Sequence, residues 1–194
     1  MIADALAGAR LRVFHATRLL DFQTILDDGL RPLDLTSQIA TVRRALVAAG
    51  QIASADDFDS TVAHVDTRDP FFQNRQHQVW GVPIRSLLHD GGCEIFFAHY
   101  GGEVIQRLAY IASPRLEAAI QAIGTPAIVT FNIPAFGCCT FGDLRLAPTM
   151  LDQMLEAEGL KSPERSGWDV LVKAAIPPAW IESVTAVERP IDFH

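Results

Sequence analysis

Three side chains in short apolar surroundings could do chemistry together. His15 lies near the end of the run "LRVFHAT", Glu103 follows two glycines in "HYGGEVI", and Asp169 opens the run "DVLV". An imidazole can hold a hydroxyl or move a proton, and a carboxylate can stabilise a positive charge that develops during a reaction. The three residues are therefore the candidates for a site, if the fold brings them together.

His15 has neighbours that suit a sugar-binding role. In a strand, Thr17 shares the face of His15, and Arg18 and the turn at Gly29 and Leu30 follow. A ring nitrogen and a hydroxyl on one strand face, beside a glycine turn, would suit a sugar hydroxyl and a carboxamide. The alternative is a half-buried histidine that donates to a backbone carbonyl and packs in the core, as most lone histidines do.

The two acidic residues each allow a structural and a functional interpretation. Glu103 could complement the dipole of the helix that it opens, or it could orient a ribose where Gly101 and Gly102 allow a ligand to approach the backbone. Asp169 could be a solvated strand end, or a carboxylate at a sheet edge that faces a cleft. The sequence leaves both pairs of alternatives open.

The loop 66–78, "DTRDPFFQNRQHQ", interleaves arginines with aromatic residues. Guanidinium groups such as those of Arg68 and Arg75 suit a pyrophosphate. We interpret the segment instead as an ordinary polar surface loop with two buried phenylalanines, Phe71 and Phe72.

The elements that must position these residues follow from periodicity and capping signals. Helical spacing follows His15 and ends at Gly29, Ser54 is a typical N-cap, and Pro114 suits a first helical turn. Helices crowd the first quarter of the chain and strands its second half, without a regular βαβ alternation, which favours one α+β domain over residues 1–194. The expected strands are 11–17, 79–83, 93–100 and 127–134, and residues 168–191 are expected to form a strand, a turn marked by proline, one helical turn and a last strand. The expected helices lie within 18–30, 37–49, 54–65, 102–113, 113–124 and 147–159.

Composition limits the classes of function. The chain of 194 residues is 49% hydrophobic and 20% charged, with a formal charge of −7, which disfavours a broad grip on nucleic acid phosphates. No apolar run is long enough for a membrane span, and no basic segment precedes the apolar N-terminus. The three cysteines, Cys93, Cys138 and Cys139, suit buried apolar positions better than a disulfide framework or a metal site. We therefore expect a cytoplasmic protein without a membrane partner or a metal.

Three quoted stretches, taken in order, resemble the ADP-ribosyltransferase superfamily, in particular small bacterial transferases and DNA-targeting toxins. "FHATRLLDFQTILDDGL" is similar to the family's opening strand and helix, "IFFAHYGGEVIQRL" to its middle strand and the helix after it, and "WDVLVKAAIPPAWIESVTAVE" to its closing strands. The resemblance covers about a third of the chain. It implies a split β-sheet core with an N-terminal helical portion, NAD as substrate, and transfer of one ADP-ribose to a macromolecular acceptor. A bacterial toxin or antiphage effector, with an antitoxin partner as an option, is the context that it suggests.

The resemblance also implies roles for individual residues. His15, Thr17, Arg18, Gly29 and Leu30 would form the part of the NAD site that the opening motif supplies.

Tyr100 would stack on the nicotinamide, and Asp169 or Glu103 would be the catalytic carboxylate, with Glu188 as a weaker third choice. Asp169 stands where the family usually has glutamate, which motivates the alternative of a non-catalytic NAD-binding or interaction module. A further alternative is an NAD glycohydrolase, in which water is the acceptor. The acidic charge of the chain favours a protein over a nucleic acid as acceptor.

Overall fold

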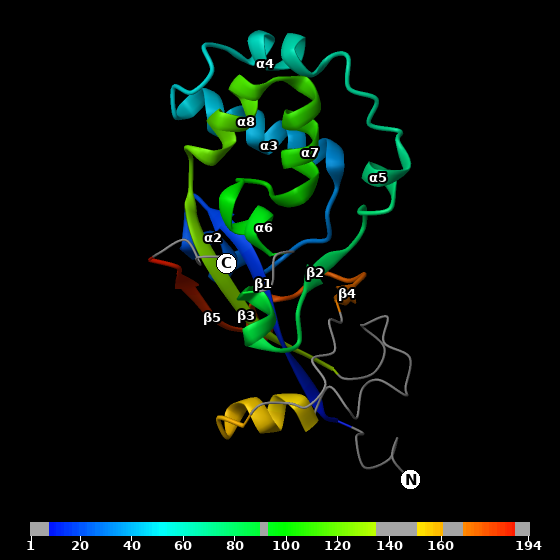
Figure 1. Ribbon diagram of the computed structural model, residues 1–194, viewed down its shortest axis with the longest axis vertical. Coiled ribbons are helices and arrows are strands. Elements are labelled where there is room, and N and C mark those ends of the chain that lie inside the picture. Colours follow the sequence, from blue (N-terminus) through cyan, green and yellow to red (C-terminus); the bar gives the residue numbers. More distant parts are fainter. Residues whose placement is uncertain (1–7, 90–92, 135–150, 161–168, 189–194) are drawn as a thin grey trace.

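A three-stranded antiparallel sheet forms the centre of the fold (Figure 1). The computed structural model describes residues 8–89, 93–134, 151–160 and 169–188. Strand β1 (Arg10–Leu19) pairs along its whole length with β3 (Thr125–Pro134), and β3 pairs on its other edge with β5 (Ile181–Ala186). The ends of the described chain thus meet in one sheet, with the central strand β3 almost fully buried.

A second, two-stranded sheet joins the first at the middle of β1. Strand β2 (Val79–Gly81) pairs with β4 (Val170–Val172), and just after β2 the backbones of Phe14 and Val82 exchange two hydrogen bonds of 2.8 Å. A Cβ on Gly81 would lie 2.5 Å from Val13 Cγ1 and 3.0 Å from the carbonyl oxygen of Phe14. Glycine is therefore needed here, because any side chain would push β2 away from β1.

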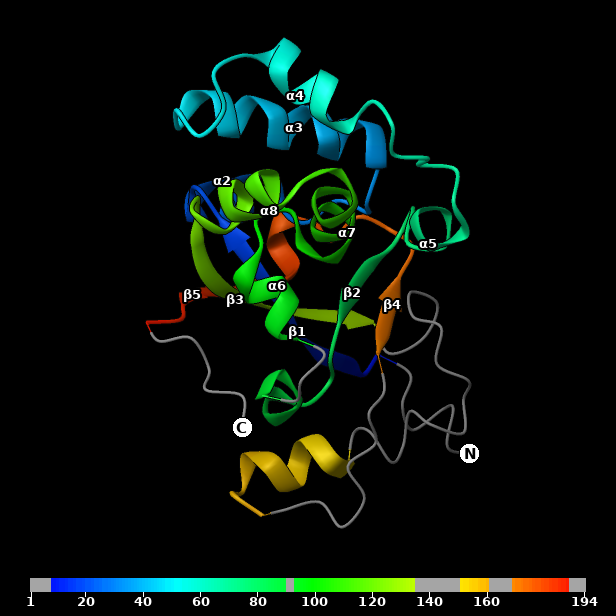
Figure 2. The same cartoon turned by 45° about the horizontal axis from the view of Figure 1, so that its top comes forward.

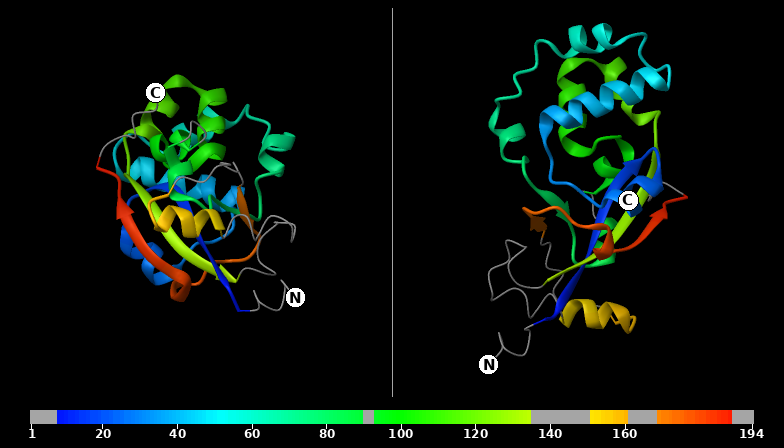
Figure 3. Two further views of the ribbon diagram at one scale, coloured as in Figure 1. Left: turned by 60° about the horizontal axis from the view of Figure 1, so that its bottom comes forward. Right: turned by 180° about the vertical axis from the view of Figure 1, so that it is seen from behind.

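Helices α3 (Leu35–Ala48), α4 (Ala55–Val62), α7 (Gly102–Ala112) and α8 (Pro114–Gln121) form a layer beyond one end of the sheets, and the helical residues 151–157 lie beyond the other end (Figure 2). Helices α3, α4, α7 and α8 share one apolar core in which Val42, Leu46, Phe58, Ile105 and Ile120 are almost completely buried. Figure 3 shows the short helix α2 on the opposite side of the molecule from the pocket-forming β2. The bounds are α2 Phe22–Asp28, α3 Leu35–Ala48, α4 Ala55–Val62, α5 Pro70–Gln73, α6 Glu94–Ala98, α7 Gly102–Ala112 and α8 Pro114–Gln121, with 3-10 turns η1 Arg85–His89 and η2 Pro178–Trp180.

Most of the predicted elements are present, and their caps are those that the sequence indicated. Ser54 accepts the backbone N–H of Asp57 at 3.1 Å, and Ser113 accepts that of Leu116 with Pro114 in the first turn of α8. Residues 151–157 are helical. The mixed α+β class is confirmed. Cys138 and Cys139 lie outside the described residues.

One predicted strand is wrong. The segment 93–100, "CEIFFAHY", contains helix α6 and not a strand. A short apolar run is compatible with either state, and tertiary contacts decide between them. Here Phe97 packs among Phe14, Ala16 and Leu88 beside β1, which one helical turn allows. Within the described part of the chain, none of the helices has the length and hydrophobicity that a bilayer crossing requires.

Candidate functional site

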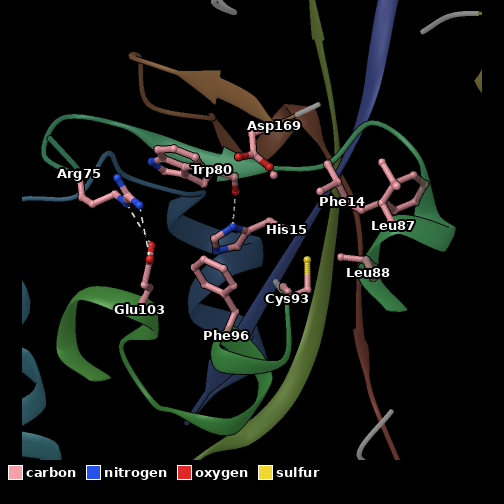
Figure 4. Close-up of a pocket in the computed structure, with 13 residues that line it drawn as sticks. Phe14, His15, Arg75, Trp80, Leu87, Leu88, Cys93, Phe96, Glu103 and Asp169 are labelled. Carbon is pink, nitrogen blue, oxygen red and sulfur yellow. Dashed lines mark hydrogen bonds and ion pairs between the residues drawn. The ribbon is translucent and has the colours of Figure 1, made fainter. Parts of the chain in front are cut away.

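A pocket of about 250 Å³ opens where the two sheets meet the helices (Figure 4). Its walls come from β1, β2, η1, α6 and the start of α7, together with the loop after α5 and the residues just before α6 and β4. Arg75 and Glu103 lie at one end of the pocket, and Leu87 and Leu88 lie at the other. A mostly apolar cavity with a few converging polar groups is the usual form of a small-molecule site. The full lining is Phe14, His15, Ala16, Arg75, Trp80, Gly81, Val82, Leu87, Leu88, Cys93, Phe96, Glu103 and Asp169.

His15 is held in one tautomer by the neighbouring sheet. Its Nδ1 lies 2.6 Å from the carbonyl oxygen of Trp80, and because a carbonyl can only accept, Nδ1 carries the proton. Burial lowers the pKa of His15, against the opposing effect of this hydrogen bond, so the ring is neutral at pH 7. Its Nε2 then has a free lone pair and makes no hydrogen bond to a described residue. His15 can accept a hydroxyl proton from a ligand in the pocket.

Arg75 and Glu103 form an ion pair at the charged end of the pocket. Nε of Arg75 donates to Oε2 of Glu103 at 3.0 Å, and Nη2 donates to Oε1 at 3.4 Å. The guanidinium carbon of Arg75 also lies 4.9 Å from the ring centre of Trp80 and 5.1 Å from that of Phe71. The loop after α5 therefore delivers a cation that two aromatic rings and one carboxylate hold in place.

Asp169 is the residue just before β4, and it lines the pocket. The register places Val170 opposite Gly81, so the preceding side chain lies close to the junction with β1. Desolvation raises the pKa of Asp169, Arg75 lowers it, and Glu103 raises it again. Its carboxylate is solvent-exposed and makes no hydrogen bond to a described residue. It is thus available to a ligand, unlike the carboxylate of Glu103.

The fold therefore unites His15, Glu103 and Asp169, which lie far apart in the sequence. It does not bring the predicted stacking residue with them. Tyr100 is absent from the pocket lining and packs instead against the helical core, where burial raises the pKa of its hydroxyl. Thr17, two residues beyond His15 on β1, is also not part of the lining. Glu188, the third carboxylate candidate, is exposed just after β5 and does not line the pocket either.

Arg18 is committed to the fold rather than to the pocket. Its guanidinium donates to three backbone oxygens, those of Ile123 at 2.8 Å, Gly124 at 2.9 Å and Phe97 at 3.1 Å. These carbonyls lie at the C-terminal ends of α8 and α6, where cations and donors are favourable. Arg18 thus anchors two helix ends to the end of β1.

Gly29 and Leu30 also have structural roles. Gly29 has φ +76° and ψ −161°, a backbone region that is almost restricted to glycine, and a Cβ here would overlap the carbonyl oxygen of Ile176. Leu30 is buried and exchanges two backbone hydrogen bonds with Ile176. The pair fastens the chain after α2 to the segment after β4. The opening motif therefore supplies three consecutive pocket residues, Phe14, His15 and Ala16, and several fold-forming ones.

Sequence reasoning did not single out the aromatic rings that line the pocket, Phe14, Trp80 and Phe96, and it interpreted Arg75 as part of an ordinary polar loop, whereas Arg75 lines the pocket. Phe96 was hidden because its segment was assigned to a strand. Arg75 was assigned to a polar loop, and the signal that could have favoured a site was the pattern of arginine among aromatic residues. Arg68, the other arginine of that loop, pairs with Asp66 in solvent.

The chain matches no protein-family model, and comparisons with curated proteins and with solved structures return no match. Within the described residues, no group of three or more histidine, cysteine or acidic side chains is arranged to hold a metal ion. The function must therefore be argued from the geometry of the pocket.

Proposed function

We propose that this protein is an NAD-dependent mono-ADP-ribosyltransferase whose site is the pocket around His15. One observation carries the proposal: beside the rings of Trp80 and Phe96, the pocket joins His15, whose Nε2 bonds no described residue, to the carboxylate of Asp169, which makes no hydrogen bond to a described residue. Hydroxyl acceptors suit a ribose, and aromatic faces suit a planar base. The same residues, His15 and Asp169, are those that the family resemblance selects.

The charge of the pocket supports a cationic aromatic ligand. The pocket lining holds two carboxylates, Glu103 and Asp169, and one guanidinium, Arg75, so its net charge is negative while His15 is neutral. The nicotinamide ring of NAD is a pyridinium cation, which is attracted both by this negative charge and by the faces of Trp80 and Phe96. A volume of about 250 Å³ lies below the range of roughly 300–1,000 Å³ for drug-sized ligands. The pocket therefore suits the nicotinamide ribose half of NAD, with the adenosine half outside it.

The chemistry follows from where charge moves. The bond between ribose C1′ and the pyridinium nitrogen breaks, and its electron pair goes to that nitrogen, which leaves as neutral nicotinamide. Positive charge develops on the ribose, and Asp169 stabilises it while accepting a hydrogen bond from the ribose 2′-hydroxyl. An acceptor nucleophile then bonds to C1′ and loses its proton to solvent or to a carboxylate. The acceptor is a macromolecule on this proposal, with a protein favoured by the acidic chain.

The arrangement of the two sheets supports the proposal of an ADP-ribosyltransferase-like split β-sheet. A three-stranded and a two-stranded sheet meet at Phe14 and Val82, and the pocket lies at their junction. We propose that these two sheets correspond to the split sheet of the ADP-ribosyltransferase superfamily. The closing motif then supplies Asp169 in place of the usual glutamate. An aspartate is one methylene shorter, and a displacement of about 1 Å at a reacting centre can lower the rate about 100-fold. Slow turnover is therefore expected.

The test is nicotinamide release from NAD by the purified full-length protein, with and without cell lysate as the source of acceptor. Asp169→Asn keeps the size of the side chain and should lower the rate at least about 100-fold. The matched control is Asp66→Asn, because Asp66 is an exposed carboxylate outside the pocket. Labelled ADP-ribose on a macromolecule identifies a transferase, and free ADP-ribose alone identifies a glycohydrolase. Absence of NAD binding by the wild-type protein would refute the proposal.

A further inference from the structure

We infer that Glu103 is a positioning residue: it holds Arg75 so that the edge of the guanidinium that bonds no described residue binds a pyrophosphate at the charged end of the pocket. This inference rests on the proposed function and assigns distinct tasks to the two acidic candidates. Asp169 contacts the reacting ribose, and Glu103 acts on the substrate through Arg75.

The contacts of Arg75 fix its plane and one of its edges. The guanidinium carbon lies 5.1 Å from the ring centre of Phe71 and 4.9 Å from that of Trp80, so two aromatic rings contact the group. The Nε–Nη2 edge donates to both oxygens of Glu103. Nη1 makes no hydrogen bond to a described residue. A guanidinium held in this way presents its remaining donors in one direction, and two parallel donors of this kind match a phosphate.

The burial of this pair sets it apart from ordinary surface ion pairs. The side chains of Arg75 and Glu103 are 28% and 27% exposed. Among the described residues, every other arginine–carboxylate pair has at least one partner that is more than 50% exposed. Exposed pairs contribute little because water screens them and the long side chains lose entropy. The Arg75–Glu103 pair is shielded, so removing one partner changes the placement of the other.

Glu103 is poorly placed to be the catalytic carboxylate. Both of its oxygens already accept hydrogen bonds from Arg75, whereas Asp169 makes none with a described residue. Glu103 is also fixed at the first turn of α7, where the helix dipole favours its negative charge. A stationary, neutralised carboxylate suits the task of holding a cation. The carboxylate that meets a developing positive charge should be unneutralised.

The separation of the two tasks predicts a separation of the kinetic constants. A residue that improves binding equally in the ground state and the transition state changes KM and leaves kcat unchanged, whereas a residue that acts on the transition state changes kcat. Glu103→Gln should therefore raise KM for NAD about tenfold, as expected for a weakened charge-assisted hydrogen bond. It should change kcat by less than about threefold, whereas Asp169→Asn should lower kcat.

The experiment measures NAD kinetics and the binding of inorganic pyrophosphate to five proteins: the wild type, Glu103→Gln, Arg75→Gln, the double variant, and the control Glu182→Gln. Glu182 is a matched control because it pairs with Arg12 Nε at 2.9 Å outside the pocket. The dissociation constant for pyrophosphate should rise about tenfold in Glu103→Gln and stay unchanged in Glu182→Gln. In the Arg75→Gln background, the Glu103 change should have no further effect, because Glu103 acts through Arg75. A thermal melt of each variant checks that it is folded.

The outcomes separate this inference from the proposed function. Equal effects of Glu103→Gln with and without Arg75, or a loss in kcat without a change in KM, would overturn the inference and leave the transferase intact. Pyrophosphate binding that depends on both residues, in a protein that does not bind NAD, would support the inference as an anion site and refute the transferase. Failure of the wild-type protein to bind either pyrophosphate or NAD would refute both.

Discussion

Lowering the pH below 6.5 should destabilise the protein in a way that depends on His15. Burial lowers the pKa of His15 in the folded state from the ordinary value of 6.5, whereas in the unfolded chain the imidazole titrates near its ordinary value. Between these two pKa values the unfolded state binds a proton that the folded state does not. The free energy of unfolding therefore decreases as the pH falls. The contribution is complete above pH 6.5 and is lost below it.

The size of this effect follows from the single proton involved. One proton bound only by the unfolded state gives a slope of at most about 1.4 kcal/mol per pH unit. Between pH 6.5 and pH 5.5, His15 should cost at most about 1 kcal/mol of stability. His15→Gln is the matched variant, because its amide can donate to the carbonyl of Trp80 but does not titrate. All other ionisable groups are common to both proteins, so the difference between the two curves isolates His15.

The assay is urea denaturation of the wild type and His15→Gln at pH 5.5, 6.5 and 7.5. The stability difference between the two proteins should shift in favour of the variant on acidification, by up to about 1 kcal/mol between pH 6.5 and pH 5.5. Parallel curves, or a shift in favour of the wild type, would refute the neutral tautomer of His15. The same tautomer predicts that the acid limb of kcat/KM assigned to His15 lies below pH 6.5, because Nε2 stays an acceptor until the ring is protonated.

Four further substitutions test the remaining assignments. Gly29→Ala should cost about 3 kcal/mol through backbone strain and overlap, and a loss below about 1 kcal/mol in a urea titration would contradict the close contact with Ile176. Arg18→Lys should cost about 2 kcal/mol in the same assay, because one ammonium cannot serve three separate carbonyls; a neutral result would argue against the anchoring role. Gly81→Ala should weaken NAD binding at least about tenfold by separating the two sheets, which calorimetry would detect, and unchanged affinity would show that the junction tolerates a Cβ. Tyr100→Leu, which removes the ring that was predicted to stack on nicotinamide, should leave the dissociation constant for NAD unchanged in the folded variant, and a tenfold rise would place Tyr100 in the site after all.

The sequence predicts the secondary structure correctly where periodicity and capping residues favour the same state as the tertiary contacts. Strand β1 alternates, and β3 is an apolar run bounded by proline and glycine, while α4 and α8 carry serine caps. Segment 93–100 failed because a run such as "IFFA" carries no periodicity that separates a strand from one helical turn. Its partner contacts, beside β1 and Leu88, come from distant parts of the chain.

The sequence predicts the pocket residues that have a recognisable local pattern beside them. His15 lies at the end of an apolar run, Asp169 lies at the start of another, and Glu103 follows two glycines. Trp80 has no such local signal. Its role depends on the approach of β2 to β1, which Gly81 permits, and on the carbonyl that it offers to His15. Both are properties of a contact between strands more than sixty residues apart.

If the protein is an ADP-ribosyltransferase, the neutral state of His15 and the ion pair of Glu103 with Arg75 have the same effect. Both reduce the positive charge that faces the ribose. Bond cleavage moves positive charge from the nicotinamide ring to the ribose, so the pocket gains by placing an unneutralised carboxylate at the ribose and nothing cationic beside it. A protonated His15 would oppose the developing charge, and desolvation lowers the pKa of His15, which favours the neutral ring at pH 7. Arg75 could oppose it as well, and the ion pair with Glu103 neutralises its charge while leaving donors for a phosphate. Asp169 then acts as the net charge of the site, which is why its replacement should affect kcat more than any other change in the pocket.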